Sequence, residues 1–406
     1  MRRVVFYLFI IAIFLAAPLA ALPRRGETAP AATPAPTATA EPTAAAPYRA
    51  VWVSYLEWQQ VDFSTPETFS GDIAVILDNI RDLGATVVLA QVRPFGDALY
   101  PSSYYPFSHL CTGQQGRDPG YDPLALLVQA AHDRGLALEA WVNPYRIQAG
   151  LTPALCDASP ATLHPDWVKY TDTGAYLDPA NTAVRQYIAD AVGELCANYD
   201  VDGIHFDDYF YPTTDPAFDA ADYAASGTAL TRDDWRRENV NALVELCHAT
   251  ARWYGVRFGV APVGDPEQNY ALQYSDAARW LRQGTVDYLM PQLYWGQEYV
   301  KDGDTSHNLA RLAGAWAALP RAAGVRLYAG LGAYRIGAGD GSDAGSEWVS
   351  GHALADQLNL LDRLGVQGAG LYRYASLFDA SDYAGLAAAE VDAVRQVWQI
   401  DQKSKD

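Results

Sequence analysis

The chain has 406 residues, which is enough for one large domain or two smaller ones. Half of the residues are hydrophobic, as in a globular protein, and the formal net charge is −19 at pH 7. This negative charge repels phosphate groups and therefore argues against nucleic acids and anionic membrane surfaces as partners. The chain is rich in aromatic residues, with 26 Tyr and 11 Trp, whose flat faces and polar edges suit sugar rings.

The first 47 residues do not have the composition of a folded domain. Arg2 and Arg3 precede an apolar run, so residues 1–23 are predicted to be a signal peptide or, alternatively, an uncleaved membrane anchor. Residues 24–47 are mostly Ala, Pro and Thr, which is typical of a disordered linker that buries no core. We therefore expect an exported domain that is secreted or held at the outer face of the cytoplasmic membrane.

From residue 48 onward, strand-like and helix-like segments alternate. Strands are predicted at residues 48–55, 86–93, 136–143, 201–207, 256–262, 286–294, 325–331 and 368–372. Helices are predicted between them, at residues 68–83, 123–134, 183–197, 231–253 and 352–364. Several helices stop at a glycine just before the next strand, as at Gly84 and Gly135.

This alternation predicts an α/β fold, a (β/α)8 TIM barrel over residues 48–400, followed by a flexible tail at 401–406. A doubly wound open sheet is the competing architecture, but no glycine-rich phosphate loop follows the first strand. Long loops at residues 94–121 and 144–178 follow the second and third strands and carry many aromatic residues. Such loops at the C-terminal face of the strands favour a cleft for an extended substrate.

The predicted strand at 201–207 ends in two carboxylates, Asp207 and Asp208, which three aromatic residues follow. Side chains alternate along a strand, so His205 and Asp207 face the barrel interior when Ile204 and Phe206 face the covering helices. Catalytic residues of such barrels lie at the carboxyl ends of the strands. The structural alternative is that Asp207 caps the next segment and Asp208 is a solvated loop residue.

Polar and aromatic side chains also mark the ends of the other strands. The residues expected to bind substrate around one cleft are Gln91, Arg93, Trp141, Asn143, Tyr145, His205, Tyr209, Gln292, Tyr294, Trp295 and Tyr372. Each polar residue alone could equally be a structural partner inside the barrel, and Arg93 in particular could be a counter-ion. Their convergence at one face favours a binding site.

The chain has four cysteines. Cys111 and Cys156 lie in the two long loops, and in an exported protein we expect a disulfide between them. Cys196 and Cys247 lie in helical patterns, where free buried thiols are expected. No spacing of ligand residues resembles a zinc site, so we expect neither a metal nor a cofactor.

Several stretches of the chain resemble the glycosyl hydrolase-like 10 family. They are RAVWVSY, QVRPFGDALYPSSYYPFS, CTGQQGRDPGYDPLALLVQAAHDRGLALEAWVNPYR, VDGIHFDDYFYP, DDWRRENVNALV, RFGVAP and VDYLMPQLYW, and they cover most of residues 48–374. The resemblance implies a barrel of exported or envelope-associated bacterial proteins that hydrolyses glycosidic bonds, with peptidoglycan glycan strands as one substrate class. The chain departs from the family at Glu139, where His is usual, and at residues 263–268, where aromatic and basic residues are usual.

Glycoside hydrolysis needs a general acid and a second carboxylate. Asp207 is the first candidate, and its partner is expected to be Asp208 or, next, Asp97, because both lie in stretches that resemble the family's motifs. We therefore predict an exported glycosidase that cleaves a cell-wall or extracellular polysaccharide, peptidoglycan glycan strands first, without an obligate protein partner. The alternatives are a carbohydrate-binding barrel without turnover and a glycosidase for another polysaccharide.

Overall fold

The computed structural model describes residues 47–150, 152–345 and 347–403. The predicted signal or anchor segment, nearly all of the linker and residues 404–406 of the tail lie outside the described residues. Ala46–Asp406 form one compact unit. None of the helices in the described ranges is both long and apolar enough to cross a membrane.

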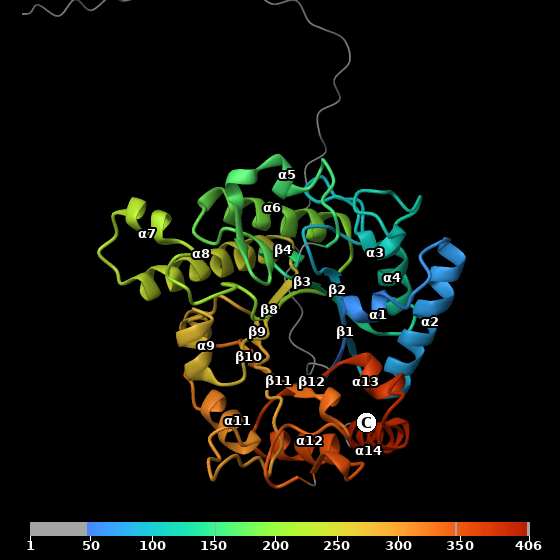
Figure 1. Ribbon diagram of the computed structural model, residues 1–406. Coiled ribbons are helices and arrows are strands. Elements are labelled where there is room, and N and C mark those ends of the chain that lie inside the picture. The colour runs from blue at the N-terminus through green and yellow to red at the C-terminus, as the bar shows by residue number, and fades with distance from the viewer. Residues whose placement is uncertain (1–46, 151, 346, 404–406) are drawn as a thin grey trace, which may run out of the picture. The chain divides into compact units, whose positions relative to one another are not determined.

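A parallel sheet at the centre of the molecule closes into a barrel (Figure 1). Its segments in chain order are β1 (Tyr48–Val53), β2 (Val87–Arg93), β3 (Ala137–Val142), β7 (Gly203–Phe206), β8 (Arg257–Val260), β9 (Tyr288–Leu289), β10 (Arg326–Leu327), β11 (Ala329–Gly332) and β12 (Gly368–Tyr372). Only Tyr328 separates β10 from β11, so the two are parts of one strand. Because β10 pairs with β9, β11 with β12, and β12 with β1, the ring closes. The predicted (β/α)8 barrel is confirmed.

Helices surround the barrel on its outer side (Figure 1). The longer ones are α2 (Pro66–Asp82), α4 (Pro123–His132), α6 (Thr182–Asn198), α8 (Arg232–Trp253), α11 (Leu309–Ala317), α12 (Ala353–Arg363) and α14 (Ala384–Lys403). Short helices lie in the loops or between strands: α1 (Tyr55–Trp58), α3 (His109–Thr112), α5 (Pro160–Leu163), α7 (Ala220–Ser226), α9 (Pro266–Leu272), α10 (Ala277–Gln283) and α13 (Tyr374–Phe378). Because α14 continues to Lys403, the tail expected from residue 401 begins later.

The predicted glycine stops have the backbone conformation that makes glycine favourable there. Gly84 and Gly135, which follow α2 and α4, have φ angles of 94° and 70°. Side chains with a Cβ rarely adopt this left-handed region, whereas glycine enters it at little cost and ends the helix. The chain can then turn directly into β2 and β3.

Two apolar cores follow from the alternation of side chains along the strands. A larger core lies between the barrel and the helices and includes Val51 and Val53 of β1. A smaller one fills the barrel interior: Tyr48, Ala50, Trp52, Val87, Leu89, Trp141, Ala261, Tyr288, Met290 and Tyr328. Since the interior is packed with these large side chains, the only room for a ligand inside the ring is above them, at the strand ends.

The long loops after β2 and β3 are built differently from the sequence expectation in two respects. The second contains a small antiparallel sheet of β4 (Arg146–Ala149), β5 (Val168–Thr171) and β6 (Gly174–Leu177), which was not predicted. The expected Cys111–Cys156 disulfide is not formed, and both cysteines have free thiols. Cys111 is packed into the outer apolar core, whereas the Cys156 thiol lies against Gly116.

Candidate active site

A pocket of about 310 Å³ opens above the barrel interior at the carboxyl ends of the strands. It is lined by Trp52, Trp141, Asp207, Asp208, Tyr209, Ala261, Gln292, Tyr294, Tyr334 and Tyr372. Two carboxylates and six aromatic rings therefore converge from separate strand ends. Rings that offer apolar faces, together with a few placed polar groups, are suited to a sugar.

Asp207 follows β7 directly and is only 4% exposed. Its carboxylate accepts hydrogen bonds from Trp141 Nε1 at 3.1 Å, from the Asn143 side-chain amide and from the backbone N–H of Tyr209 at 3.2 Å. Burial raises the pKa of Asp207, while the positive charge of Arg146 and these three donors lower it. Burial is the largest influence and leaves the pKa raised, and the three donors and the charge of Arg146 offset part of the cost of burying the anion.

Asp208 is half-buried beside Asp207 and has a different environment. It accepts a hydrogen bond of 2.8 Å from Gln292 Nε2, and Gln292 is itself held by the Ala261 carbonyl at 2.9 Å. Burial and the negative charge of Asp207 raise the pKa of Asp208 to about 7. The pair therefore combines one carboxylate supported as an anion with one that holds a proton near neutral pH.

Residues behind the pocket fix the orientation of Asn143. Gln91 donates a hydrogen bond from its side-chain amide to the Asn143 carbonyl oxygen, and Gln91 Oε1 accepts one from the backbone N–H of Tyr55 at 2.8 Å. The Asn143 carbonyl is thus occupied, so its NH₂ group faces Asp207. Gln91 and Asn143 accordingly position the carboxylate and do not line the pocket.

His205 lies in the barrel interior, below the pocket floor. Its Nε2 accepts a hydrogen bond from Trp52 Nε1 at 3.2 Å, and its Nδ1 is 2.7 Å from the hydroxyl of Tyr288. That hydroxyl donates its own proton to buried Glu139, so Nδ1 of His205 is the donor to Tyr288. Burial lowers the pKa of His205 to about 3, which keeps the ring neutral. His205 thus holds Trp52 in place.

Tyrosine rings form one wall of the pocket. Tyr294 and Tyr372 stack with centroids 5.6 Å apart, and Tyr334 meets both rings edge-on. Tyr209 is 53% exposed at the opening. These rings provide both a flat surface and an exposed edge against which a sugar can rest.

Arg93 was predicted to face the cleft, and this prediction is wrong. The pairing of β2 with β3 shifts by one residue between Gln91 and Arg93, so that Arg93 stands opposite Val142, a residue of the outer core. The Arg93 guanidinium consequently lies 4.3 Å over the ring of Tyr105, outside the barrel. A shift of one residue moves a side chain to the opposite face of a sheet.

Asp97, the second choice for a catalytic partner, is buried in the loop after β2. It accepts hydrogen bonds from His109 Nδ1 at 3.0 Å and Gln115 Nε2 at 3.3 Å. Asp97 is not among the residues that line the pocket. Its contacts organise the loop, and they leave Asp208 as the carboxylate beside Asp207.

Two predicted binding aromatics also lie away from the pocket lining. Tyr145 is fully buried in the outer core. The half-buried ring of Trp295 packs against His307, with centroids 4.9 Å apart. Tyr145 lies three residues beyond the end of β3 and Trp295 six residues beyond the end of β9, so both have left the regular strands where alternation predicts the side-chain direction.

Three residues at the site were not predicted. Trp52 lies on the inward face of β1, which the spacing from Tyr48 would have indicated. Tyr334 lies two residues beyond β11. Arg146 follows Tyr145 in the loop after β3, and its guanidinium lies 4.9 Å over Phe95 and 5.6 Å over Tyr209. No periodic pattern marks Tyr334 or Arg146, because both belong to loops.

In residues 47–150, 152–345 and 347–403, no three His, Cys, Asp or Glu side chains are grouped so that they could hold a metal ion.

Comparison with known proteins gives matches over most of the chain. A model of the family described as glycosyl hydrolase-like 10 matches residues 47–350. The glycosyl hydrolase YngK of Bacillus subtilis (strain 168) is 36% identical over 316 residues, which are 71% of this chain and 61% of YngK. The glycosyl hydrolase DigH of Escherichia coli (strain K12) is 34% identical over 359 residues, which are 78% of this chain and 79% of DigH. The chain thus corresponds to about three fifths of YngK.

A solved structure has a similar fold. The glycoside hydrolase domain of PgaB (BpsB) from Bordetella bronchiseptica superposes with a TM-score of 0.53, over 87% of this chain and 99% of that domain. The sequence identity is 16%, so this likeness concerns the fold alone.

Proposed function

This chain belongs to the glycosyl hydrolase-like 10 family, and we propose that it is a glycosidase that acts after export on the glycan strands of peptidoglycan. The observation that carries the assignment of the active site is the adjacent pair Asp207 and Asp208 in one aromatic pocket. Hydrogen-bond donors and the positive charge of Arg146 stabilise the anion of Asp207, whereas burial and the neighbouring charge raise the pKa of Asp208 to about 7. A glycosidase needs one protonated and one ionised carboxyl group.

The proposed reaction uses the two carboxyl groups in separate roles. Asp208 gives its proton to the glycosidic oxygen as the bond from this oxygen to the anomeric carbon breaks. Asp207, held as an anion by Trp141 and Asn143, faces the positive charge that develops on the sugar ring. Water supplies the hydroxyl group that ends on the anomeric carbon, and its remaining proton returns to the carboxyl pair.

Two features of the chain support a wall glycan as the substrate. The apolar run at residues 1–23 and the Ala, Pro and Thr linker have the composition of an export signal followed by a spacer. The acidic chain, with a net charge of −19, also disfavours polyanions such as nucleic acids. Peptidoglycan glycan strands are the substrate class that the family resemblance implies.

The test is to incubate the purified protein with intact peptidoglycan, with peptide-free peptidoglycan and with a panel of other polysaccharides, and to identify products by mass spectrometry. We expect oligosaccharides from peptidoglycan, each one water heavier than the unit cleaved from the strand. Products from another polysaccharide alone would contradict the proposed substrate. Binding without products from any glycan would instead favour a carbohydrate-binding barrel without turnover.

A further inference from the structure

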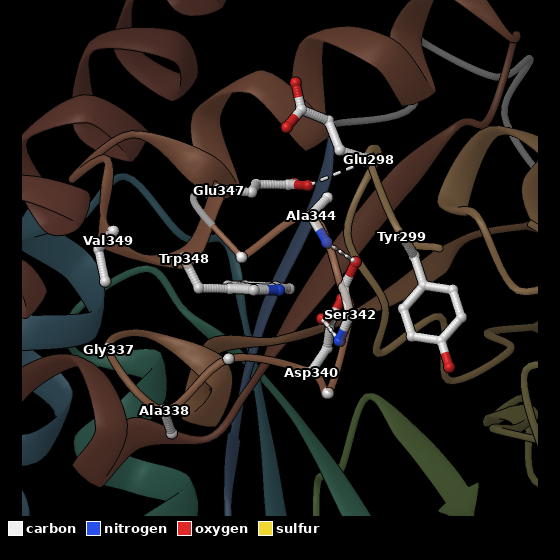
Figure 2. A pocket seen from close by; sticks show the side chains of 13 residues that line it. Glu298, Tyr299, Gly337, Ala338, Asp340, Ser342, Ala344, Glu347, Trp348 and Val349 are labelled. Atoms are coloured by element: carbon white, nitrogen blue, oxygen red, sulfur yellow. Dashed lines mark hydrogen bonds between the residues drawn. The ribbon is translucent and has the colours of Figure 1, made fainter. Parts of the chain in front are cut away.

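A second pocket, of about 240 Å³, lies between the loop after β11 and the loop after β9. Glu298 and Tyr299 contribute to it from the second of these loops, and residues of the ranges 337–345 and 347–349 contribute from the first. Figure 2 shows the indole of Trp348 lying across this pocket, with its nitrogen facing Ser342. The function proposed above does not use any of these residues.

The Trp348 nitrogen is a donor without an acceptor. Trp348 is 4% exposed, and its Nε1 has no hydrogen-bond partner in the described part of the chain. A buried donor that is left unpaired costs about 1–3 kcal/mol, so such groups usually have a partner. Because Nε1 points into a cavity, an oxygen atom of a ligand can supply the missing acceptor.

The acidic groups of this pocket are hydrogen-bond acceptors. Asp340, Glu347 and Glu298 line it, and no Lys or Arg does so. Asp340 accepts from the backbone N–H of Gly296 at 2.7 Å and of Ser342 at 3.0 Å, which leaves part of its capacity unused, since a carboxylate offers about four acceptor positions. A lining that offers the indole N–H, two hydroxyls and three carboxylates is complementary to a group of sugar hydroxyls, each of which can both donate and accept.

A direct contact links this pocket to the active site. Tyr334 lines the active-site pocket, and the guanidinium of Arg335 lies 4.7 Å over its ring. Arg335 also donates a hydrogen bond of 3.3 Å to the carbonyl of Gly339, which lines the second pocket. Both pockets therefore have part of their lining on the segment that leaves β11 at the carboxyl end of the barrel.

We propose that the pocket around Trp348 is an accessory subsite that binds one sugar unit of the glycan whose neighbouring part occupies the active site. This inference rests on the proposed function, because it assigns the second pocket to the same polysaccharide. The indole N–H would donate to a ring substituent oxygen, and Asp340 and Glu298 would accept from hydroxyls. The enzyme would consequently prefer long oligosaccharides to short ones.

The test measures binding without turnover. Asp207→Asn protein, with and without Trp348→Phe, is titrated calorimetrically with peptide-free peptidoglycan oligosaccharides of two, four and eight sugars. Phenylalanine keeps an aromatic ring and removes only the N–H group, so we expect Kd to rise about three- to tenfold for the longest oligosaccharide. For the disaccharide, which cannot reach both pockets, we expect a change of less than twofold. Trp253→Phe, at an indole that is 85% exposed on α8, is the matched control and should leave every Kd unchanged.

The possible results separate this inference from the proposed function. Oligosaccharide binding that is insensitive to Trp348→Phe, or equally weakened at every length, overturns the subsite and leaves the proposed function standing. Failure of all the oligosaccharides to bind overturns both. A length-dependent loss specific to Trp348→Phe supports the subsite even if the wild-type protein releases no products.

Discussion

Asp207 and Asp208 are neighbours in sequence, yet the structure surrounds them with different groups. Asp207 receives three hydrogen bonds and lies near the positive charge of Arg146. Asp208 receives one hydrogen bond from a neutral amide and lies beside a negative charge. We expect this contrast to give the two carboxyl groups different roles, and four predictions follow from it.

Asp207→Asn is expected to lower kcat by about 10³-fold or more, because asparagine keeps the shape but cannot become an anion. The melting temperature should stay within a few degrees of the wild-type value. Both quantities are obtained from a product assay and a thermal unfolding curve. If Asp207 were only structural, activity would fall in proportion to the folded fraction.

The loss of activity caused by Asp208→Asn is expected to depend on the leaving group of the substrate. Cleavage of the natural glycan should fall strongly, whereas an aryl glycoside with an acidic phenol should lose far less, because such a leaving group needs no proton. The measurement is kcat/KM for the two substrates. An equal loss for both would exclude Asp208 as the general acid.

The pH dependence of kcat/KM should reflect the titration of both Asp207 and Asp208. Asp208 must keep its proton, so kcat/KM should fall as pH rises through about 7, the pKa of this group. Asp207 must lose its proton, and since burial raises its pKa, the acidic limb should lie above the usual range of aspartate. A profile that is flat between pH 6 and 9 would contradict the assignment of Asp208.

Arg146→Met tests whether the positive charge of Arg146 stabilises the ionised form of Asp207. The guanidinium lowers the pKa of Asp207, so its removal should raise that pKa and move the acidic limb of the profile to higher pH. Arg146→Lys retains the charge and should shift the limb less. A profile unchanged in Arg146→Met would show that other groups hold Asp207 ionised.

At the scale of elements, glycines on the inner face of the barrel make room for large side chains of the neighbouring strands. A Cβ added to Gly259 of β8 would come within 2.0 Å of the Tyr288 ring. That ring cannot move without losing its hydrogen bonds with Glu139 and with His205, and His205 in turn holds Trp52 at the pocket floor. The absence of a side chain at Gly259 of β8 is thus required for the arrangement that supports the floor of the active-site pocket.

Gly259→Ala is therefore expected to destabilise the protein by about 3 kcal/mol or more, as overpacking of a buried site does. Gly255, just before the same strand, has a φ of 76° and nothing within 4 Å of an added Cβ. Gly255→Ala should lower the free energy of unfolding by only about 1–2 kcal/mol, from backbone strain alone. Denaturant unfolding measures both values, and equal costs would show that the Tyr288 ring moves freely.

At the scale of the molecule, the barrel closes through pairing of its first and last strands. β1 begins at Tyr48 and pairs with β12, and both belong to the compact unit that starts at Ala46. The helices that cover the outer core also lie within this unit.

A protein that begins at Ala46 should accordingly fold with the melting temperature of the longer chain and cleave soluble oligosaccharides at the same rate. Thermal unfolding and a product assay on both proteins check this expectation. A lower melting temperature of the shorter protein would mean that the first 45 residues stabilise the barrel.

The amino-acid sequence was sufficient to predict the barrel fold and the position of the strand that leads to Asp207. Strand-like runs separated by helical patterns and glycine stops are local signals, and all eight predicted strands lie in the sheet. Trp141 and Tyr372 were found because alternation on a regular strand predicts which side chains face inward. Asp207 and Gln292 lie beyond the ends of β7 and β9, and there the same alternation, continued past the strand, still gave the correct direction.

The tertiary structure alone decided the rest of the site. The register shift after Gln91 turned Arg93 out of the barrel, and such a shift depends on the neighbouring strand β3. Arg146 and Tyr334 reach the site from loops, whose conformation is set by long-range contacts. The pKa values of Asp207 and Asp208 likewise depend on burial and on charges that are distant in sequence, and no local pattern encodes either quantity.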